Sequence, residues 1–251
     1  MSLLDNANRF DSRSYLLCWL FVLFCIPPIA TAEPFFKPFT ASFRVYRSAL
    51  PLGDLELKFN LSQDGNYRYH AHTMPGLLAG LFSGDEVIEE SHGWLNQERV
   101  TPLRYLYQLD DGDEENTQVL FDWPDKEVHT TSKGVTWSQP IEPNTQDRLS
   151  QQLLVRLELS RGSENLEYRV ADGGRIKRYR FQVVSRETVK TPYGHFDCLR
   201  VERSKESRPP DYTIWFAPAL DYLPVRIERQ QRGNQYRMVL DELKGFEFPE
   251  T

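Results

Sequence analysis

Apolar and polar residues alternate with a period of two along most of this chain. Every second side chain is apolar over 39–45, 55–61, 103–109 and 119–123. Successive side chains of a β-strand point to opposite faces of a sheet, so this period is typical of strands with one buried face. An Asp-Gly pair at 64–65, between two such runs, predicts a tight hairpin, because glycine accepts the positive φ of the turn. The sequence therefore predicts a mainly β protein.

One segment has helical spacing instead. Leucines recur on one side of a predicted helix near 146–159, at Leu149, Leu153, Leu154 and Leu157. Asn144 and Thr145 are candidate caps, and Gly162 is a stop signal. Alternating runs then resume and continue to residue 240. About a dozen strands with one substantial helix predict a large, strongly curved antiparallel sheet, closing toward a barrel or arranged as a two-sheet sandwich.

The first 32 residues have the three parts of a secretory signal peptide. Arg9 and Arg13 precede an apolar run over 15–26, and Ala30-Thr31-Ala32 forms a small-residue cleavage site. The apolar run is short for a transmembrane span of about 20 residues. We expect cleavage after Ala32, which leaves one β-rich periplasmic domain over 33–251 that is not an integral membrane protein. An uncleaved anchor is the alternative.

Charge and cysteine content narrow the function classes. The chain has 30 Lys and Arg against 36 Asp and Glu, a formal net charge of -6. A protein that binds nucleic acid through phosphate contacts usually carries a basic excess, so we expect no nucleic-acid partner. Cys198 is the one cysteine left after signal cleavage and lies in an apolar, strand-like run. We expect its thiol to be buried and inert.

An ordered series of short motifs runs through the chain. It includes Glu89-Glu90-Ser91-His92-Gly93, Asp147-Arg148-Leu149-Ser150, Thr191-Pro192-Tyr193-Gly194 and Tyr222-Leu223-Pro224-Val225-Arg226. The series resembles the bacterial family called "domain of unknown function 3108", exported proteins of the Gram-negative envelope. The resemblance implies a periplasmic, mainly antiparallel β domain. It implies no reaction and therefore no catalytic residues.

The sequence contains none of the common catalytic motifs, such as Gly-x-Ser-x-Gly or His-Glu-x-x-His. Ser91 and His92 are adjacent, so in one regular strand they point to opposite faces and form no nucleophile–base pair. His70 and His72 share a face and could bind zinc with His92 or Glu90, although such a pair on a solvent face is common. We expect no metal and no cofactor. A hydrolase with an unrecognised site is the enzymatic alternative.

The apolar, glycine-rich segment 74–84 lies between strands, where polar turn residues are expected. It is either a plug at the end of the barrel or a lid over an apolar interior, since curved sheets can enclose a ligand cavity. The candidate ligand-binding residues come from this segment and from aromatic positions of the strands: Met74, Leu77, Leu78, Leu81, Phe82, Tyr67, Tyr105, Tyr107, Phe121 and Trp215. Tryptophans could instead stack on sugar rings, with Trp94, Trp123, Trp137 and Trp215 as candidates.

These features predict a periplasmic, non-enzymatic module that binds or escorts another component of the cell envelope. The expected ligand is apolar, acyl or lipid-like, and is held in a barrel mouth or groove. A polysaccharide-interacting or structural envelope partner is the second hypothesis, and a hydrolase is the third. The expected partner is accordingly a lipid, a glycan or an envelope protein.

Overall fold

The period-two pattern becomes strands whose alternate side chains are buried. In β1 (Phe39–Arg47), the side chains of Phe39, Ala41, Phe43 and Val45 are buried, as the alternation predicts. The computed structural model describes residues 36–76, 86–109, 116–205, 209–231 and 233–246. These residues belong to one compact unit, Pro34–Thr251.

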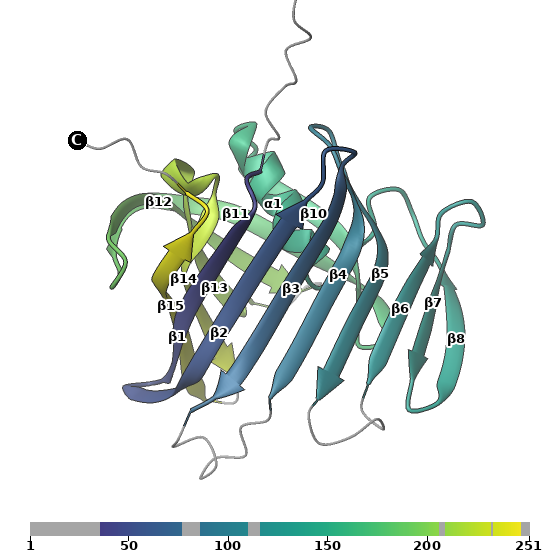
Figure 1. The fold of residues 1–251 in the computed structure, drawn as a ribbon, viewed down its shortest axis with the longest axis horizontal. Helices are drawn as coiled ribbons and strands as arrows, with labels where there is room; N and C mark the ends of the chain where they lie inside the picture. The colour runs from purple at the N-terminus through teal and green to yellow at the C-terminus, as the bar shows by residue number, and fades with distance from the viewer. Residues whose placement is uncertain (1–35, 77–85, 110–115, 206–208, 232, 247–251) are drawn as a thin grey trace, which may run out of the picture. The chain divides into compact units, whose positions relative to one another are not determined.

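Strands make up most of this unit (Figure 1). The first group is β2 (Leu50–Leu61), β3 (Asn66–Pro75), β4 (Val87–Leu95), β5 (Val100–Leu109), β6 (Thr117–Asp122), β7 (Glu127–Ser132) and β8 (Val135–Pro140). After β9 (Gln146–Asp147) and α1 (Ser150–Ser160) come β10 (Asn165–Asp172), β11 (Arg175–Lys190), β12 (His195–Lys205), β13 (Tyr212–Ala217), the short 3-10 helix η3 (Pro218–Leu220), β14 (Leu223–Gln231) and β15 (Asn234–Lys244).

All the strands join one sheet, in the order β8-β7-β6-β5-β4-β3-β2-β1-β15-β14-β13-β12-β11-β10-β9. Neighbours are antiparallel except for the two-residue parallel pair of β9 with β10. Laid flat, 15 strands would span roughly 65 Å between edges. The chain passes from edge strand β8 to edge strand β9 within residues 141–145, which reach at most about 20 Å. The sheet must therefore curl until its edges approach each other.

Contacts other than strand pairing connect each edge of the sheet to the opposite half. Trp137 of β8 donates its indole N–H to the backbone carbonyl of Gly174, in the β10–β11 turn, at 3.0 Å. Gln146 of β9 donates its side-chain amide to the carbonyl of Val100 on β5, at 3.0 Å. We call the Trp137–Gly174 contact the edge clasp. In the described residues β8 and β9 do not pair, so the curled sheet stays open.

Helix α1 lies between the two facing halves of the curled sheet (Figure 1). Its leucines Leu153, Leu154 and Leu157 are buried, and so is Arg156. The Arg156 guanidinium donates to the backbone carbonyl of Asp221 at 3.0 Å and lies 4.2 Å from the centre of the Phe36 ring. Because nearly every side of the helix is covered, it belongs to the core of the unit.

The predicted fold class is confirmed: the unit is mainly β, with one large curved sheet and one substantial helix. The sheet neither closes as a barrel nor divides into a sandwich. The predicted helix limits need one correction, because Gln146 and Asp147 form β9 and α1 begins at Ser150.

Cys198 is a buried free thiol, as expected, and burial raises its pKa to about 12. In the described residues no helix is long and apolar enough to cross a membrane.

Candidate functional site

The inner face of the curled sheet contains a cavity of about 540 Å³. This volume falls within the range of roughly 300–1,000 Å³ that is usual for ligand pockets. Strands of both halves of the sheet and the start of α1 contribute to its wall. The cavity therefore exists only because the sheet curls and brings distant strands face to face.

One part of the cavity wall is apolar. Leu55 and Leu57 of β2 and Ala71 of β3 come from the N-terminal half of the sheet. Strands β13, β14 and β15 contribute Ile214, Phe216, Ile227 and Met238, and α1 contributes Val155. Each strand places every second side chain here, as Ile214 and Phe216 show, so the alternation seen in the sequence builds this surface. An alkyl chain lying against it would lose its contact with water.

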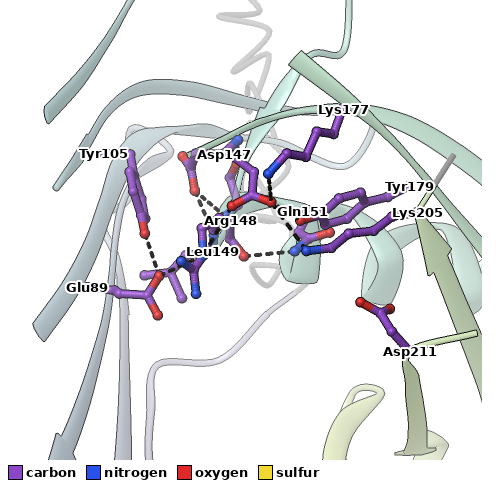
Figure 2. Close-up of polar contacts among 12 residues, drawn as sticks. Glu89, Tyr105, Asp147, Arg148, Leu149, Gln151, Lys177, Tyr179, Lys205 and Asp211 are labelled. Carbon is purple, nitrogen blue, oxygen red and sulfur yellow. Dashed lines mark hydrogen bonds and ion pairs between the residues drawn. The ribbon is translucent and has the colours of Figure 1, made fainter. Parts of the chain in front are cut away.

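The other part of the wall carries charge, centred on the carboxylate of Asp172 at the end of β10. Asp172 Oδ2 accepts hydrogen bonds from Lys177 Nζ at 2.8 Å, Tyr179 OH at 2.7 Å and Lys205 Nζ at 3.3 Å. Figure 2 shows the side chains of Lys177, Tyr179 and Lys205 extending toward a common region. Burial alone would raise the pKa of the Asp172 carboxyl, but the Lys177 and Tyr179 hydrogen bonds and the charges of Lys205 and Arg148 hold it well below its usual range.

Arg148 approaches the other oxygen of the same carboxylate. Its Nε lies 4.0 Å from Asp172 Oδ1 and 3.2 Å from Glu89 Oε1. Glu89 of β4 also accepts a hydrogen bond from Tyr105 OH, and the Arg148 guanidinium lies 5.6 Å from the centre of the Tyr107 ring. The Arg148 side chain keeps 42% of its surface exposed, so solvent and small molecules can reach it.

Cations and aromatic rings alternate across β11 to β14. The order is Lys205, Tyr179, Arg203, Tyr212 and Arg229, with cation-to-ring distances of 4.9, 4.6, 3.8 and 5.3 Å. Asp211 neutralises Arg203 through hydrogen bonds of 2.9 to 3.2 Å. Cation–π contacts fix the side chains without cancelling their charge. This row therefore adds positive charge to the cavity wall.

The position of Arg148 depends on a buried hydrogen-bonded turn before α1. Asp147 Oδ1 accepts the backbone N–H groups of Leu149 and Ser150, and Ser150 Oγ accepts the N–H of Asp147, all at 2.8 Å. This reciprocity is that of a capping box. Ser91 Oγ donates to Asp147 Oδ2 at 2.6 Å and lies 3.0 Å from Tyr67 OH. The turn is thereby anchored to β3 and β4.

Asp147 titrates unusually because it is buried. Loss of solvation raises the pKa of its carboxyl to about 6, although the hydrogen bonds from Ser91, Ser150 and Leu149 act in the opposite direction. Burial also raises the pKa of Tyr67 well above its usual value, and the nearby Asp147 adds to the effect. The group that positions Arg148 therefore changes charge near neutral pH.

The structure places the predicted ligand-binding residues at several separate locations. Tyr107 lines the cavity. Tyr67 and Tyr105 are buried beside it and bound to Ser91 and Glu89, whereas Phe121 stacks on Trp123 and Met74 is exposed at the end of β3. Trp215 lies on the opposite face of β13 from Ile214 and Phe216, and Arg226 stacks on its ring at 4.8 Å. Leu77, Leu78, Leu81 and Phe82 lie outside the described residues.

The other candidate residues also have definite locations. His72 bonds to Glu86 and His92 to Glu90, and the described residues include no group of three or more His, Cys, Asp or Glu side chains arranged to hold a metal. Trp94 is 45% exposed, whereas Trp123 and Trp137 donate their indole N–H groups to backbone carbonyls.

Among the residues that the structure describes, a hydroxyl and an imidazole meet on the outer surface. His129 Nδ1 and Ser138 Oγ are 2.7 Å apart as cross-strand neighbours of β7 and β8. A nucleophile–base pair for catalysis also needs a group that orients the base, and a cavity for the substrate. The pair lies on an exposed face of the hairpin, away from the residues that line the cavity.

The cationic residues of the cavity and Asp172 were missed by the sequence analysis. Lys177 and Lys205 sit in ordinary alternating strands, and the pairing of β10, β11 and β12 brings them to Asp172. A signal did exist for Arg148, because it belongs to the Asp147-Arg148-Leu149-Ser150 motif of the family resemblance. The motif has a physical role: its Asp and Ser fix the turn, and its Arg points into the cavity.

Residues 42–241 match the family described as "Protein of unknown function (DUF3108)". The chain belongs to the DUF3108 family. The resemblance inferred from the motifs is thus confirmed, and the matched region of this DUF3108 member contains every residue that lines the cavity.

Solved structures place this DUF3108 member among known folds. A β-barrel-like protein of domain of unknown function DUF1849 from Brucella abortus is similar over 84% of this chain and 99% of its own, with a TM-score of 0.61 and 11% identity. This likeness concerns the fold alone. A putative exported protein with a YmcC-like fold from Bacteroides fragilis aligns over 84% of this chain and 97% of its own, at 14% identity, but its TM-score is 0.32 and supports no argument. No curated protein matches the chain.

Proposed function

We propose that this protein is an exported, non-enzymatic module that binds an apolar chain inside its curled sheet and escorts it within the cell envelope. The observation that carries the proposal is the cavity of about 540 Å³, whose apolar wall comes from both halves of the sheet. Ile214, Ile227 and Met238 form a continuous part of that wall. A wall of this kind suits an acyl or alkyl chain better than a strongly hydrated sugar.

Export to the periplasm is the second part of the proposal and rests on residues 1–32. Their basic start, apolar run and Ala30-Thr31-Ala32 ending have the order of a cleavable signal. When the full chain is produced in a Gram-negative host, we expect the purified protein to begin at Glu33. Intact-protein mass spectrometry measures this directly. A mass that retains residues 1–32 would contradict cleavage.

Binding is tested with three ligands that share a dodecyl chain and differ in head group: dodecanol, dodecylamine and dodecyl phosphate, each below the concentration at which it aggregates or separates from water. We expect saturable binding of at least one of them by isothermal titration calorimetry. Ile214→Trp and Met238→Trp each fill part of the cavity and weaken that binding roughly tenfold, equivalent to about 1.4 kcal/mol.

Val135→Trp is the matched control, because Val135 lies 60% exposed on β8 and does not line the cavity. It leaves the affinity unchanged within about twofold. Circular dichroism shows whether each variant keeps its β structure. Absence of binding to all three dodecyl compounds, or binding that neither cavity variant alters, would contradict the proposed function.

A further inference from the structure

The charges around the cavity do not balance. Five cationic side chains line it: Arg148, Lys177, Arg203, Lys205 and Arg229. Two lining carboxylates, Asp172 and Glu89, oppose them, and Asp211 at the edge neutralises Arg203. Five positive charges thus face three negative ones, although the whole chain has a net charge of -6. This local excess is opposite in sign to the charge of the protein.

The cations around Asp172 have unused hydrogen-bonding capacity. A lysine ammonium has three N–H donors, and in the described residues the ion pairs of Lys177 and Lys205 are both with Asp172. Asp172 Oδ2 already accepts three donors, including Tyr179 OH, so it has little capacity for more. Side-chain exposures of 29% for Lys177, 27% for Lys205 and 42% for Arg148 leave these groups within reach of a ligand.

Apolar and cationic surfaces are continuous within this one cavity. Arg203 of β12 pairs with Tyr212 of β13, and Ile214 and Phe216 follow on the same face of that strand. Burial lowers the pKa of Lys205 because partial loss of water disfavours its charge, while Asp172 opposes the shift. Burial removes part of the hydration of the Lys205 ammonium. An anionic ligand group beside it, in addition to Asp172, would replace that hydration with an ion pair and hydrogen bonds.

We propose, building on the proposed function, that the ligand is an amphiphile with an oxyanion head group, a phosphate or a carboxylate, held between Arg148 on one side and Lys177 and Lys205 on the other. Its alkyl chain lies along Ile214, Ile227 and Met238. Arg148 offers a planar pair of donors that matches two oxygens of such a head group, and the lysines supply compact positive charge.

The same three dodecyl compounds test this inference. We expect dodecyl phosphate to bind about tenfold or more tightly than dodecanol, and dodecylamine to bind most weakly, because its ammonium meets like charges. Raising the salt concentration from about 0.05 to 0.5 M weakens dodecyl phosphate binding and leaves dodecanol binding unchanged. Equal affinity for dodecyl phosphate and dodecanol would overturn the inference while leaving the proposed function intact.

Lysine variants locate the head group. In Lys177→Gln/Lys205→Gln we expect dodecyl phosphate affinity to fall roughly tenfold and dodecanol affinity to stay within about twofold. The control Lys190→Gln/Lys244→Gln removes two exposed lysines of β11 and β15 and changes neither. Arg148→Gln tests the opposite side independently, should the double variant fail to fold, and it lowers dodecyl phosphate affinity selectively. An equal loss for both ligands would overturn the assignment.

Inorganic phosphate separates an amphiphile site from a simple anion site. We expect it to bind at least about tenfold more weakly than dodecyl phosphate, since it gains nothing from the apolar wall. Inorganic phosphate that binds as tightly as dodecyl phosphate would overturn the amphiphile assignment. If none of the dodecyl compounds binds, both the proposed function and this inference fail. If they bind without preference for dodecyl phosphate, only this inference fails, so the two failures are distinguishable.

Discussion

At the scale of single residues, Asp147 connects the core of the protein with its cavity. Its carboxylate fixes the turn that presents Arg148, and it does so from a fully buried position. Burial raises its pKa from 3.8 to about 6. The folded protein therefore binds a proton on Asp147 more readily than the unfolded chain does, and ionisation of this group opposes folding.

Substitution of Asp147 by Asn removes the ionisable group, so comparison with the wild type measures the free-energy cost of ionising Asp147 in the folded protein. The contribution of Asp147 to stability is greatest below its unfolded pKa of about 4 and is lost as the pH rises through about 6. The free energy of unfolding of Asp147→Asn minus that of the wild type should thus increase by roughly 3 kcal/mol between about pH 4 and pH 7. Urea denaturation across this range measures it. Groups common to both proteins cancel, so a pH-independent difference would contradict the assignment.

Single residues also mark the limit of inference from sequence. The burial of Phe39, Ala41 and Phe43 follows directly from period two, because each residue's face depends only on its neighbours in the strand. The grouping of Lys177 with Lys205 and Asp172 depends on the register between the consecutive strands β10, β11 and β12, which the alternation within each strand does not determine. The aromatic candidates were chosen for their chemical type. Chemical type does not determine where a side chain lies, and Trp215 and Phe121 do not line the cavity.

At the scale of elements, the edge clasp holds the β8 edge of the sheet against the β10–β11 turn, as strand pairing would in a closed barrel. Gly174 adopts a φ of +72°, and a Cβ added there would lie 2.3 Å from the Trp137 ring. The close approach of the β8 edge to the β10–β11 turn therefore requires glycine. The β7–β8 hairpin that carries Trp137 lacks a long alternating apolar run, which is why the sequence analysis did not identify it.

Two glycine variants measure the clasp. Gly134, in the β7–β8 turn, has the same φ of +72° but has no atom within 4 Å of an added Cβ. Both Gly174→Ala and Gly134→Ala should cost about 1–2 kcal/mol from the left-handed backbone. Gly174→Ala should lose a further 1 kcal/mol or so, because the Trp137 ring must move. Urea denaturation of both variants gives the difference, and equal losses would show that the clasp is energetically unimportant.

At the scale of the whole compact unit, the strand order and one short connection determine the architecture. The chain moves outward from β1 to β8, crosses to the far edge within residues 141–145, and returns inward to pair β15 with β1. This path forces the sheet to curl, places α1 between its halves and encloses the cavity. Local alternation predicted most of the strands, and their number predicted the curvature, but only long-range pairing determines that the sheet stays open.

The central claim is that a ligand's apolar chain lies inside the curled sheet. Isoleucine methyl NMR tests it most directly, because Ile214 and Ile227 line the cavity whereas the buried Ile141 does not. With saturating dodecyl phosphate, we predict that the Ile214 and Ile227 methyl signals shift and that the Ile141 signal stays in place. Ile214 and Ile227 signals that do not move while the ligand binds would contradict the account.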